Sequence, residues 1–509
     1  MDWNRGYLVD SGYTYDYFQE TNPTHLRFMA SLNNHYLPDS NFRYLELGCG
    51  QGFNLICMAA LNPSCEFVGI DFYPEHIAHG KALASKAKLK NVHFIEADFV
   101  DLSANPEHLG LFHIVVAHGI STWISAETRE KLFMLASKVM EPGGLMYNSY
   151  NCYPGWLPAT PFQRLVIEYQ KFYGGVESQK KAMATLKDLK DNKSPLFKML
   201  PDLSARLDSL SNKPIDYLLQ EYNHPVWQPV YSSDMLRIAS SFKLDFISSA
   251  NLPFAFTGSY TSFQNNLFES QPDVMLRECV KDIACNTQFR RDLYVKGANP
   301  LWKNDAQNLL LNQHVIFRLS EFSEIPGLGD TFCTFPLGTG NEAKVSKEKL
   351  QAVVSLCHDS PCSIGEIVSS SGLSLSDVLF IVSLLISKNS LAFSSPSTQF
   401  AESLALNEAI LDSCKSGAPY SYLVYPKFCS AGKLDIPSML MVSELRAVTP
   451  ENDLTSCFVS AAKSLGLRRE GVLLSGSKLL EFAKQTISEL NQKILPPLLR
   501  SKALSWVDS

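Results

Sequence analysis

The sequence lacks several features that mark whole classes of protein. Nowhere do about 18 apolar residues run together, so we expect no helix that crosses a membrane. Residues 1–18 contain no long apolar stretch behind a basic segment, which argues against a secretory signal. The 12 cysteines include no CxxC pair, and the 11 histidines show no HxxxH spacing. We therefore expect no metal site and a reducing, cytoplasmic compartment.

Basic residues are too few to suggest a nucleic-acid partner. The net charge of the 509-residue chain is −6, whereas a protein that binds a polyanion usually carries a basic stripe. Hydrophobic residues make up 45% of the chain and charged residues 19%, which is enough to build large cores. The length predicts about two to four domains.

Residues 42–150 alternate short apolar runs with helical patterns. The runs are rich in β-branched and aromatic residues and end at turn-forming residues, as strands do. Five such repeats predict a doubly wound, parallel α/β sheet. The expected strands are 42–47, 66–70, 92–97, 112–117 and 144–150, and the expected helices are 53–61, 75–88 and 125–140.

Two later segments are expected to return to this sheet and complete seven strands. They are 245–251 and 314–322, and one of them would form an edge hairpin. Mostly helical stretches are expected over 160–237 and 271–293, as insertions around the returning strands.

A glycine-rich loop follows the first expected strand. It has the pattern E-x-G-x-G-x-G, with Glu46 at the strand end and Gly48, Gly50 and Gly52 before the next helix. A dinucleotide site would need its third glycine at position 53, which is Phe53, and a P-loop would need Gly-Lys-Ser/Thr. The loop therefore favours a ligand that lies close to bare backbone and presents no phosphate to it.

Acidic residues stand at the ends of the next two strands. Asp71 lies about 20 residues beyond the loop, where a carboxylate can accept both hydroxyls of a ribose. Asp98 and Phe99 follow the third strand, where they could bond the adenine amino group and stack on its ring. Because the carboxyl ends of parallel strands share one edge, we expect a single crevice. Asp71 could instead cap the following helix, and Asp98 could be a turn residue.

The loop motif resembles the first motif of the class I S-adenosylmethionine-dependent methyltransferases. The methionine end of that cofactor carries no phosphate, which agrees with the absence of a P-loop. The resemblance implies that Glu46 orients the loop or bonds the cofactor's ammonium. It also implies that His118, after the fourth strand, is the next contact, unless it is a surface-loop histidine. The expected cofactor-binding residues are Tyr13, Thr21, Glu46, Gly48, Cys49, Gly50, Gly52, Asn54, Asp71, Phe72, Asp98, Phe99 and His118.

Two further motifs resemble a narrower family, the methyltransferases that carry a regulatory domain. Its characterised members are rickettsial lysine methyltransferases that act on an outer-membrane protein. Residues 117–123 match the family's A-H-G-x-x-S/T-W motif, and residues 149–156 match its S-Y-N-x-x-P-G-W motif. Residues 289–297 resemble the regulatory domain, and residues 495–500 the C-terminal domain. Asn22 departs from the pattern, because the family usually has histidine there.

This resemblance implies methyl transfer to a lysine amine. A lysine must lose its proton before it can attack, and a desolvating aromatic channel lowers the pKa of the amine. The expected channel-lining, catalytic residues are Tyr150, Asn151, Trp156 and Trp123, with Tyr13 and Phe18 as a lid. The two tryptophans could instead pack loops on the sheet edge, and Tyr13 could belong to a mobile N-terminus. The sequence identifies no general base.

The chain is expected to divide into a methyltransferase core and appended regions. Residues 344–398 predict a helix-turn-helix, but four lysines balance four acidic residues there and 374–387 is almost wholly apolar. A buried winged helix or a protein-docking surface is therefore favoured over a reader of DNA. The expected units are 1–160 and 238–322 for the core, 161–237 with 252–312 for a helical insertion and regulatory domain, 344–398 for a winged-helix-like domain, and 400–509 for a mostly helical C-terminal domain.

Three functions stay open at this point. The first is a methyltransferase that acts on lysine side chains of a protein substrate gripped by the C-terminal domains. The second is a small-molecule methyltransferase whose appended domains regulate it or form a homodimer. The third is a module without catalysis, which the intact glycines, Asp71 and Asp98 disfavour. No nucleic-acid partner and no membrane insertion are expected.

Overall fold

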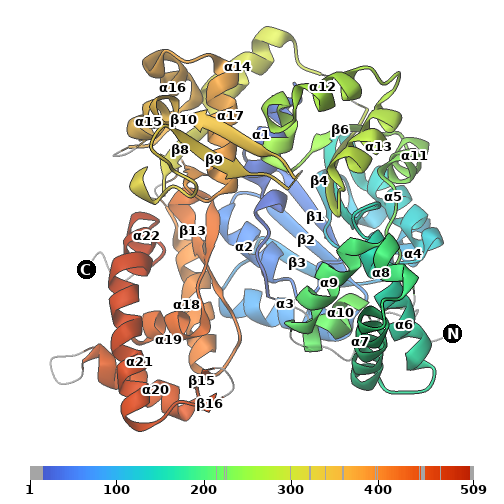
Figure 1. Cartoon of the computed structure of the whole chain (residues 1–509). Helices are drawn as coiled ribbons and strands as arrows, with labels where there is room; N and C mark the ends of the chain where they lie inside the picture. Colours follow the sequence, from blue (N-terminus) through green and yellow to red (C-terminus); the bar gives the residue numbers. More distant parts are fainter. Residues whose placement is uncertain are drawn as a thin grey trace.

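A central sheet of seven strands organises the molecule (Figure 1). The computed structural model describes residues 15–504, apart from positions 214, 223, 225, 298–299, 320–321, 339, 358–359, 396, 398, 446–447, 449–452 and 470–471. The strand order is β3-β2-β1-β4-β5-β7-β6. The bounds are β1 Arg43–Leu47, β2 Glu66–Asp71, β3 Val92–Glu96, β4 Phe112–Ala117, β5 Met140–Asn151, β6 Leu244–Ser249 and β7 Phe289–Lys296.

The first five strands run parallel, as the repeating pattern predicts, and the last two form an antiparallel edge. The expected seven-stranded α/β class is confirmed, and so are the five early strands and three early helices. The segment 245–251 returns to the sheet as β6, as expected.

The expected return of 314–322 to the sheet is wrong. That segment contains β8 (Val315–Arg318), which pairs with two short strands outside the central sheet, β11 (Cys362–Ser363) and β12 (Leu391–Phe393). The missing sheet strand is β7, whose first residues fall in the stretch expected to be helical. Arg290 and Asp292 break the apolar pattern of this strand, but inside the fold their charges pair with one another.

Helices cover both faces of the sheet, as a buried parallel sheet requires. On one face, apolar residues of the strands share a core with α1, α2 and α3. On the opposite face they pack with α4, α5 and α11. The bounds are α1 Pro23–Leu32, α2 Phe53–Leu61, α3 Pro74–Lys86, α4 Phe99–Ala104, α5 Ala126–Val139 and α11 Ser232–Ser241.

A helical insertion follows β5 and has a small core of its own. This core contains Trp156, Phe162 and Tyr222, all buried. Helices α12 and α13 lead from β6 into β7. The bounds are α6 Thr160–Gln170, α7 Gly175–Asp191, α8 Pro195–Met199, α9 Pro201–Ser211, α10 Ile215–Tyr222, α12 Ser262–Glu269 and α13 Val274–Cys285.

The expected helix-turn-helix consists of α16 and α17, which begin at capping serines Ser363 and Ser374. Most apolar side chains of α17 are buried, so this helix serves packing. In a winged helix, the strand after the second helix usually pairs with a further strand that follows it. In the described part of this region β12 instead pairs with β8, which precedes the helix-turn-helix in the sequence. The bounds are α14 Lys303–Gln313, β9 Phe332–Pro336, β10 Glu342–Ser346, α15 Lys347–Val354, α16 Ile364–Ser371 and α17 Leu375–Ser387.

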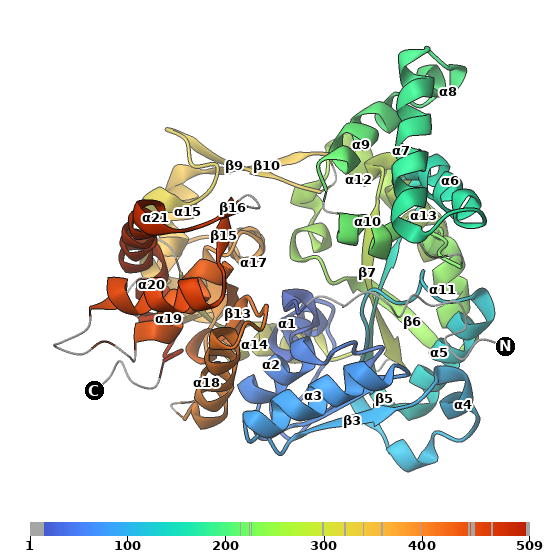
Figure 2. The same ribbon diagram turned by 90° about the horizontal axis from the view of Figure 1, so that it is seen from below.

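The C-terminal region is mostly helical, and it lies on the opposite side of the molecule from the helical insertion (Figure 2). Its first helix, α18, packs against α2, where Ser403 Oγ donates to the carbonyl of Ala60 at 2.8 Å. The bounds are α18 Ala401–Lys415, β13 Tyr422–Tyr425, β14 Ser430–Lys433, α19 Ile436–Glu444, α20 Leu454–Ser464, β15 Arg468–Arg469, β16 Val472–Leu473, α21 Gly476–Glu489 and α22 Leu495–Arg500. Among the described residues, no helix combines the length and apolar character needed to cross a bilayer.

Candidate active site

The glycine loop connects β1 to α2 and lies close to its neighbours. Gly48 and Gly52 have φ angles of +70° and +75°, which side chains rarely tolerate. A Cβ on Gly48 would stand 2.7 Å from Ile120 Cγ2, and one on Gly52 would stand 2.4 Å from the Phe94 ring. Only glycine fits at these two positions, and the bare backbone that results can lie against a ligand.

Asp71, at the end of β2, supports this loop. One carboxylate oxygen accepts the N–H of Gly50 at 2.9 Å, and the other accepts the N–H of Tyr73 at 3.0 Å. His76 Nδ1 lies 3.3 Å from the second oxygen. The side chain does not cap α3, whose capping position is Tyr73. A carboxylate has about four lone-pair sites, so Asp71 keeps capacity for a ribose hydroxyl.

Asp71 faces a cavity of about 220 Å³ at the carboxyl edge of the sheet. Asp98 lines the same cavity and also caps α4 by accepting the N–H of Val100 at 2.7 Å, so it has a structural role as a helix cap and not as a turn residue. The sequence did not predict the other residues that line this cavity, among them His76, Ile120 and Val226: His76 and Val226 belong to no motif, and Ile120 fills a variable position of the A-H-G-x-x-S/T-W motif. The expected residues that line this cavity are Gly48, Asp71, Phe72, Asp98, Phe99 and Trp123.

Glu46 lies on the other side of the loop, in a buried polar network. Its Oε1 accepts from Asn54 Nδ2 at 3.2 Å, and the same nitrogen donates to Thr21 Oγ1 at 3.1 Å. Glu46 Oε2 has no hydrogen-bond partner among the described residues. Burial raises the pKa of Glu46 to about 8; the hydrogen bond from Asn54 opposes this shift, and the nearby charge of Asp71 adds to it. A buried acceptor without a donor is suited to an incoming ammonium group.

Residues 15–22, which we call the strap, cross this network. The ring of Phe18 stacks on His118 with centroids 3.9 Å apart, and its N–H donates to Asn54 Oδ1 at 3.1 Å. Tyr44 donates its hydroxyl to the carbonyl of Thr21 at 3.0 Å. The strap therefore covers the end of the crevice beside Glu46. Tyr13, the other expected lid residue, lies outside the described residues.

Asn22 ties the strap to the C-terminal region. Its Nδ2 donates to the hydroxyl of Tyr17 and to the carbonyl of Cys429, both at 2.7 Å. Its Oδ1 accepts the N–H of Thr24 and caps α1. Asn22 is 1% exposed, so all these contacts are internal. The asparagine that departs from the family pattern thus has a structural role of its own.

His118 directly follows β4, and its imidazole lies partly buried against aromatic rings. Its Nδ1 is 3.0 Å from the Tyr147 hydroxyl and 3.3 Å from Ser149 Oγ. Burial lowers the pKa of His118 to about 4, so the ring is neutral near pH 7. Because it is neutral, the His118 ring stacked on Phe18 can form part of the wall of a ligand pocket without attracting counter-ions.

Tyr150 does not lie in the expected channel. Successive side chains of a strand point to opposite faces, so Tyr147, Ser149 and Asn151 share the face of His118 while Tyr150 takes the other. The Tyr150 hydroxyl donates to Asp292 at 2.6 Å, and the side chain is fully buried. This placement corrects the expectation that Tyr150 lines the channel.

Trp156 is also displaced from the channel. It belongs to the core of the helical insertion, where its ring packs against Trp227 with centroids 5.0 Å apart and under the guanidinium of Arg206. Trp156 therefore has a packing role, as its alternative interpretation proposed, but it packs within the insertion and not on the sheet edge. Asn151 is buried on the same face as Ser149, and its backbone N–H donates to Thr122 Oγ1 at 3.4 Å.

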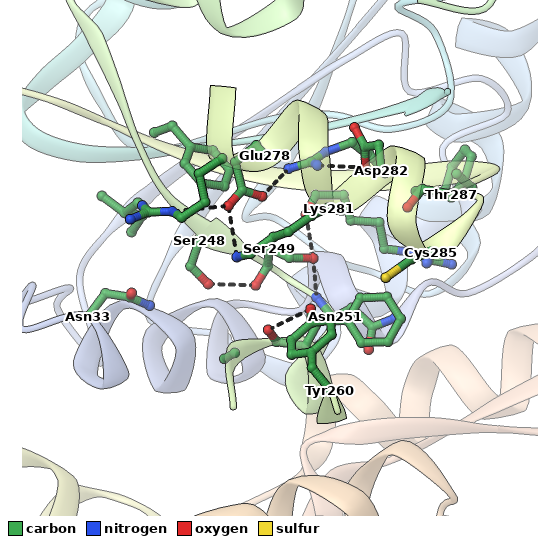
Figure 3. Close-up of a pocket in the computed structure, with 18 residues that line it drawn as sticks. Asn33, Ser248, Ser249, Asn251, Tyr260, Glu278, Lys281, Asp282, Cys285 and Thr287 are labelled. Atoms are coloured by element: carbon green, nitrogen blue, oxygen red, sulfur yellow. Dashed lines mark hydrogen bonds and ion pairs between the residues drawn. The ribbon is translucent and has the colours of Figure 1, made fainter. Parts of the chain in front are cut away.

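A buried ionic network lies beside β5 and β7. Arg290 donates to Asp292, Asp282 and Glu278, each at 2.9 Å, and Asp292 in turn holds Tyr150. Figure 3 shows Glu278 and Asp282 of α13 at the wall of a cavity that Ser249 and Asn251 close on the other side. The network joins α13 to the strand that carries Ser149.

Comparisons with known proteins identify the family of the chain. Residues 38–198 match the family model described as a methyltransferase domain, and residues 214–296 match the predicted methyltransferase regulatory domain. An uncharacterised protein of Synechocystis, sll1526, is 30% identical over 372 residues, which are 72% of this chain and 72% of the relative. The chain belongs to the methyltransferases with this regulatory domain. The regulatory region contains β6 and β7, so it completes the methyltransferase's own sheet.

Solved structures show the same fold over nearly the whole methyltransferase. PKMT2 from Rickettsia typhi covers 97% of this chain and 99% of its own, with a TM-score of 0.68 and 18% identity. A second structure of PKMT2, in complex with AdoHcy, covers 95% of this chain at the same TM-score and 19% identity. A further uncharacterised protein, RP789 of Rickettsia prowazekii, is 23% identical over 59% of this chain and 54% of the relative.

S-adenosylmethionine is the cofactor of this methyltransferase, and the residues present fit its parts. The unpartnered oxygen of Glu46 suits the ammonium, the glycine backbone suits the methionine chain, and Asp71 and Asp98 suit the ribose and adenine. When bound, the cofactor supplies a methyl group on a sulfonium.

Proposed function

We propose that this enzyme methylates lysine side chains of a protein substrate. The observation that carries the proposal is the aromatic surface that His118 and its neighbouring rings form close to Glu46. Around the neutral ring of His118 stand Phe18 at 3.9 Å, Tyr147 at 5.8 Å and Phe289 at 6.5 Å between centroids. Such a surface disfavours the charged form of an amine and so helps it to arrive with a free lone pair.

The same rings support the later part of the reaction. As the amine nitrogen forms its bond to the methyl carbon, the C–S bond breaks and its electron pair stays on sulfur. The nitrogen thereby gains a positive charge, which aromatic faces attract. The remaining work of the protein is to align the nitrogen with the C–S bond at about 3 Å and to exclude water. Phe18, which covers His118, is placed to exclude water.

Two further findings support a protein substrate. The AHG and SYN motifs resemble those of rickettsial lysine methyltransferases, and the likeness to PKMT2 extends through the appended domains. Those domains also touch the site, because the strap is bonded to Cys429. A large substrate could therefore contact the core and the C-terminal region together.

The test is incubation of the enzyme with tritiated S-adenosylmethionine and lysate. We expect label in macromolecules and, after hydrolysis and mass spectrometry, on lysine. Label confined to small solutes would instead support a small-molecule methyltransferase. The Asp71→Ala variant serves as the control without cofactor binding, and label that persists in it would show that another enzyme in the lysate is responsible.

A further inference from the structure

A second cavity, of about 370 Å³, opens on the other side of the strap. Its walls come from five parts of the chain that are distant in sequence. Gln19, Glu20 and His25 belong to the strap and α1, and Arg291 belongs to β7. The remaining walls are the segment 251–254 after β6, the tip of the β9–β10 hairpin at 336–338, and the end of α17 at 386–389.

His25, which lines this cavity, has a ring nitrogen without a hydrogen-bond partner. Its Nε2 donates to the carbonyl of Ala250 at 2.7 Å, so Nδ1 carries no proton in the neutral ring. Nδ1 has no hydrogen-bond partner among the residues that the structure describes, although the side chain is only 3% exposed. Burial lowers the pKa of His25, which keeps the ring neutral. A buried ring nitrogen of this kind needs a donor from outside.

Glu20 supplies a second acceptor in the same cavity. Its carboxylate pairs with Arg291 Nε at 3.2 Å, and both side chains stay partly exposed. Although burial opposes it, the charge of Arg291 holds the pKa of Glu20 below its usual value, so the group is a carboxylate. Because one contact to Arg291 leaves lone pairs unused, Glu20 can accept another hydrogen bond.

The cavity adjoins the aromatic surface around His118. Arg291 lies over the ring of Phe289 at 4.9 Å, and Phe289 is a neighbour of His118. Glu20 is two residues along the strap from Phe18, which stacks on His118. The charges of Glu20 and Arg291 both act on the His118 imidazole. A side chain that enters past Glu20 would therefore come to the aromatic surface around His118.

We infer that this cavity receives the substrate's lysine side chain, with Glu20 and His25 Nδ1 accepting the two N–H groups of its neutral amine. The inference rests on the proposed function. It adds the route by which the lysine enters and the groups that recognise its amine. A neutral primary amine has two N–H donors and one lone pair, so two acceptors leave the lone pair free for the methyl carbon.

The cationic groups at the cavity agree with a neutral guest. Arg291 offsets the charge of Glu20, and Lys388 stands at the rim, where its Nζ donates to the carbonyl of Pro336 at 3.1 Å. Like charges nearby disfavour an ammonium, so a lysine is expected to give its proton to water before it is seated. Glu20 and His25 then orient the amine. The tip of the β9–β10 hairpin and the end of α17 line the cavity, so the appended domains take part directly in substrate entry.

The test compares Glu20→Gln and His25→Gln with a matched control, Glu348→Gln, an exposed carboxylate on α15. Transfer of tritium to lysate protein should fall by at least about tenfold in the first two variants, because each loses a hydrogen-bond acceptor for the amine. The control should transfer as the wild type does. The Kd for S-adenosylmethionine should not change in any variant, which excludes misfolding. Full transfer by both site variants would overturn the inference while leaving the proposed function intact.

A second measurement covers the case in which the wild type labels no protein, so that the proposed function fails. The probe is Nα-acetyl-L-lysine N-methylamide, added to the enzyme saturated with S-adenosylhomocysteine and carrying ¹⁵N-labelled histidine. A shift of the His25 Nδ1 resonance, absent in Glu20→Gln, would support an amine site. An unchanged resonance at saturating probe would overturn it.

Discussion

Glu46 makes cofactor binding sensitive to pH in a way that can be measured. Its carboxyl group is buried, one oxygen has no partner within the described residues, and burial raises its pKa to about 8. Near pH 7 the free enzyme therefore holds Glu46 mostly protonated, by roughly nine parts in ten. An ammonium beside it favours the carboxylate form. Binding of S-adenosylmethionine should consequently release a proton.

The size of the effect follows from linkage. A ligand that requires the ionised group binds in proportion to the ionised fraction, which rises roughly ninefold between pH 6 and pH 7 for a pKa of about 8. Affinity therefore rises with pH across this window. The cofactor's own ammonium stays protonated there, since an α-amino group titrates at about 7.7 to 8.0. The rise must level off above the pKa of Glu46.

Calorimetry in buffers of different ionisation enthalpy measures both the number of protons released on binding and the affinity for the cofactor. We expect close to one proton released per cofactor at pH 7 and a steep rise of affinity with pH. Glu46→Gln keeps the shape of the side chain but cannot ionise, so its affinity should be lower and nearly flat over the same window. The reasoning is refuted if the wild type releases no proton, or if the glutamine variant shows the same pH dependence.

Three further outcomes are expected. Asp71→Asn should raise the Kd for S-adenosylmethionine about 10- to 100-fold by calorimetry, because a charged acceptor for the ribose is lost, and an unchanged Kd would place the nucleoside elsewhere. Tyr150→Phe should leave turnover unchanged. It should lower the free energy of unfolding in urea by about 1 to 3 kcal/mol, because Asp292 loses a buried hydrogen-bond donor. A large loss of turnover would show that Tyr150 takes part in the reaction. Gly52→Ala should lower that free energy by about 1 to 3 kcal/mol, because the new Cβ would meet the Phe94 ring, and unchanged stability would contradict the geometry.

The core of the fold could be predicted because its signals are local. Each early strand and helix has its own periodicity, and the glycine loop and Asp71 stand at strand ends that must share one edge. The strand β7 could not be recognised in this way. Arg290 and Asp292 look like surface residues until Asp282 and Glu278, which come from α13, are brought beside them. Only the tertiary fold supplies such partners.

In the candidate site, too, some residues could be placed from local sequence patterns and others could not. Alternation along β5 separates Tyr150 from Ser149 and Asn151, so its face was within reach of sequence reasoning. Trp156 follows the strand in a loop, where no period applies. His25 was hidden for a different reason: its significance lies in an acceptor that stays unused after folding, and a sequence does not show which hydrogen bonds are left unmade.

The bond between Asn22 and Cys429 joins positions 407 residues apart. During synthesis, residue 22 is made long before residue 429, so the strap cannot form this bond until Cys429 has been made. Nascent or truncated polypeptides that already contain a complete sheet should therefore be poor catalysts. The cell would thereby be spared methyl transfer by half-made enzyme.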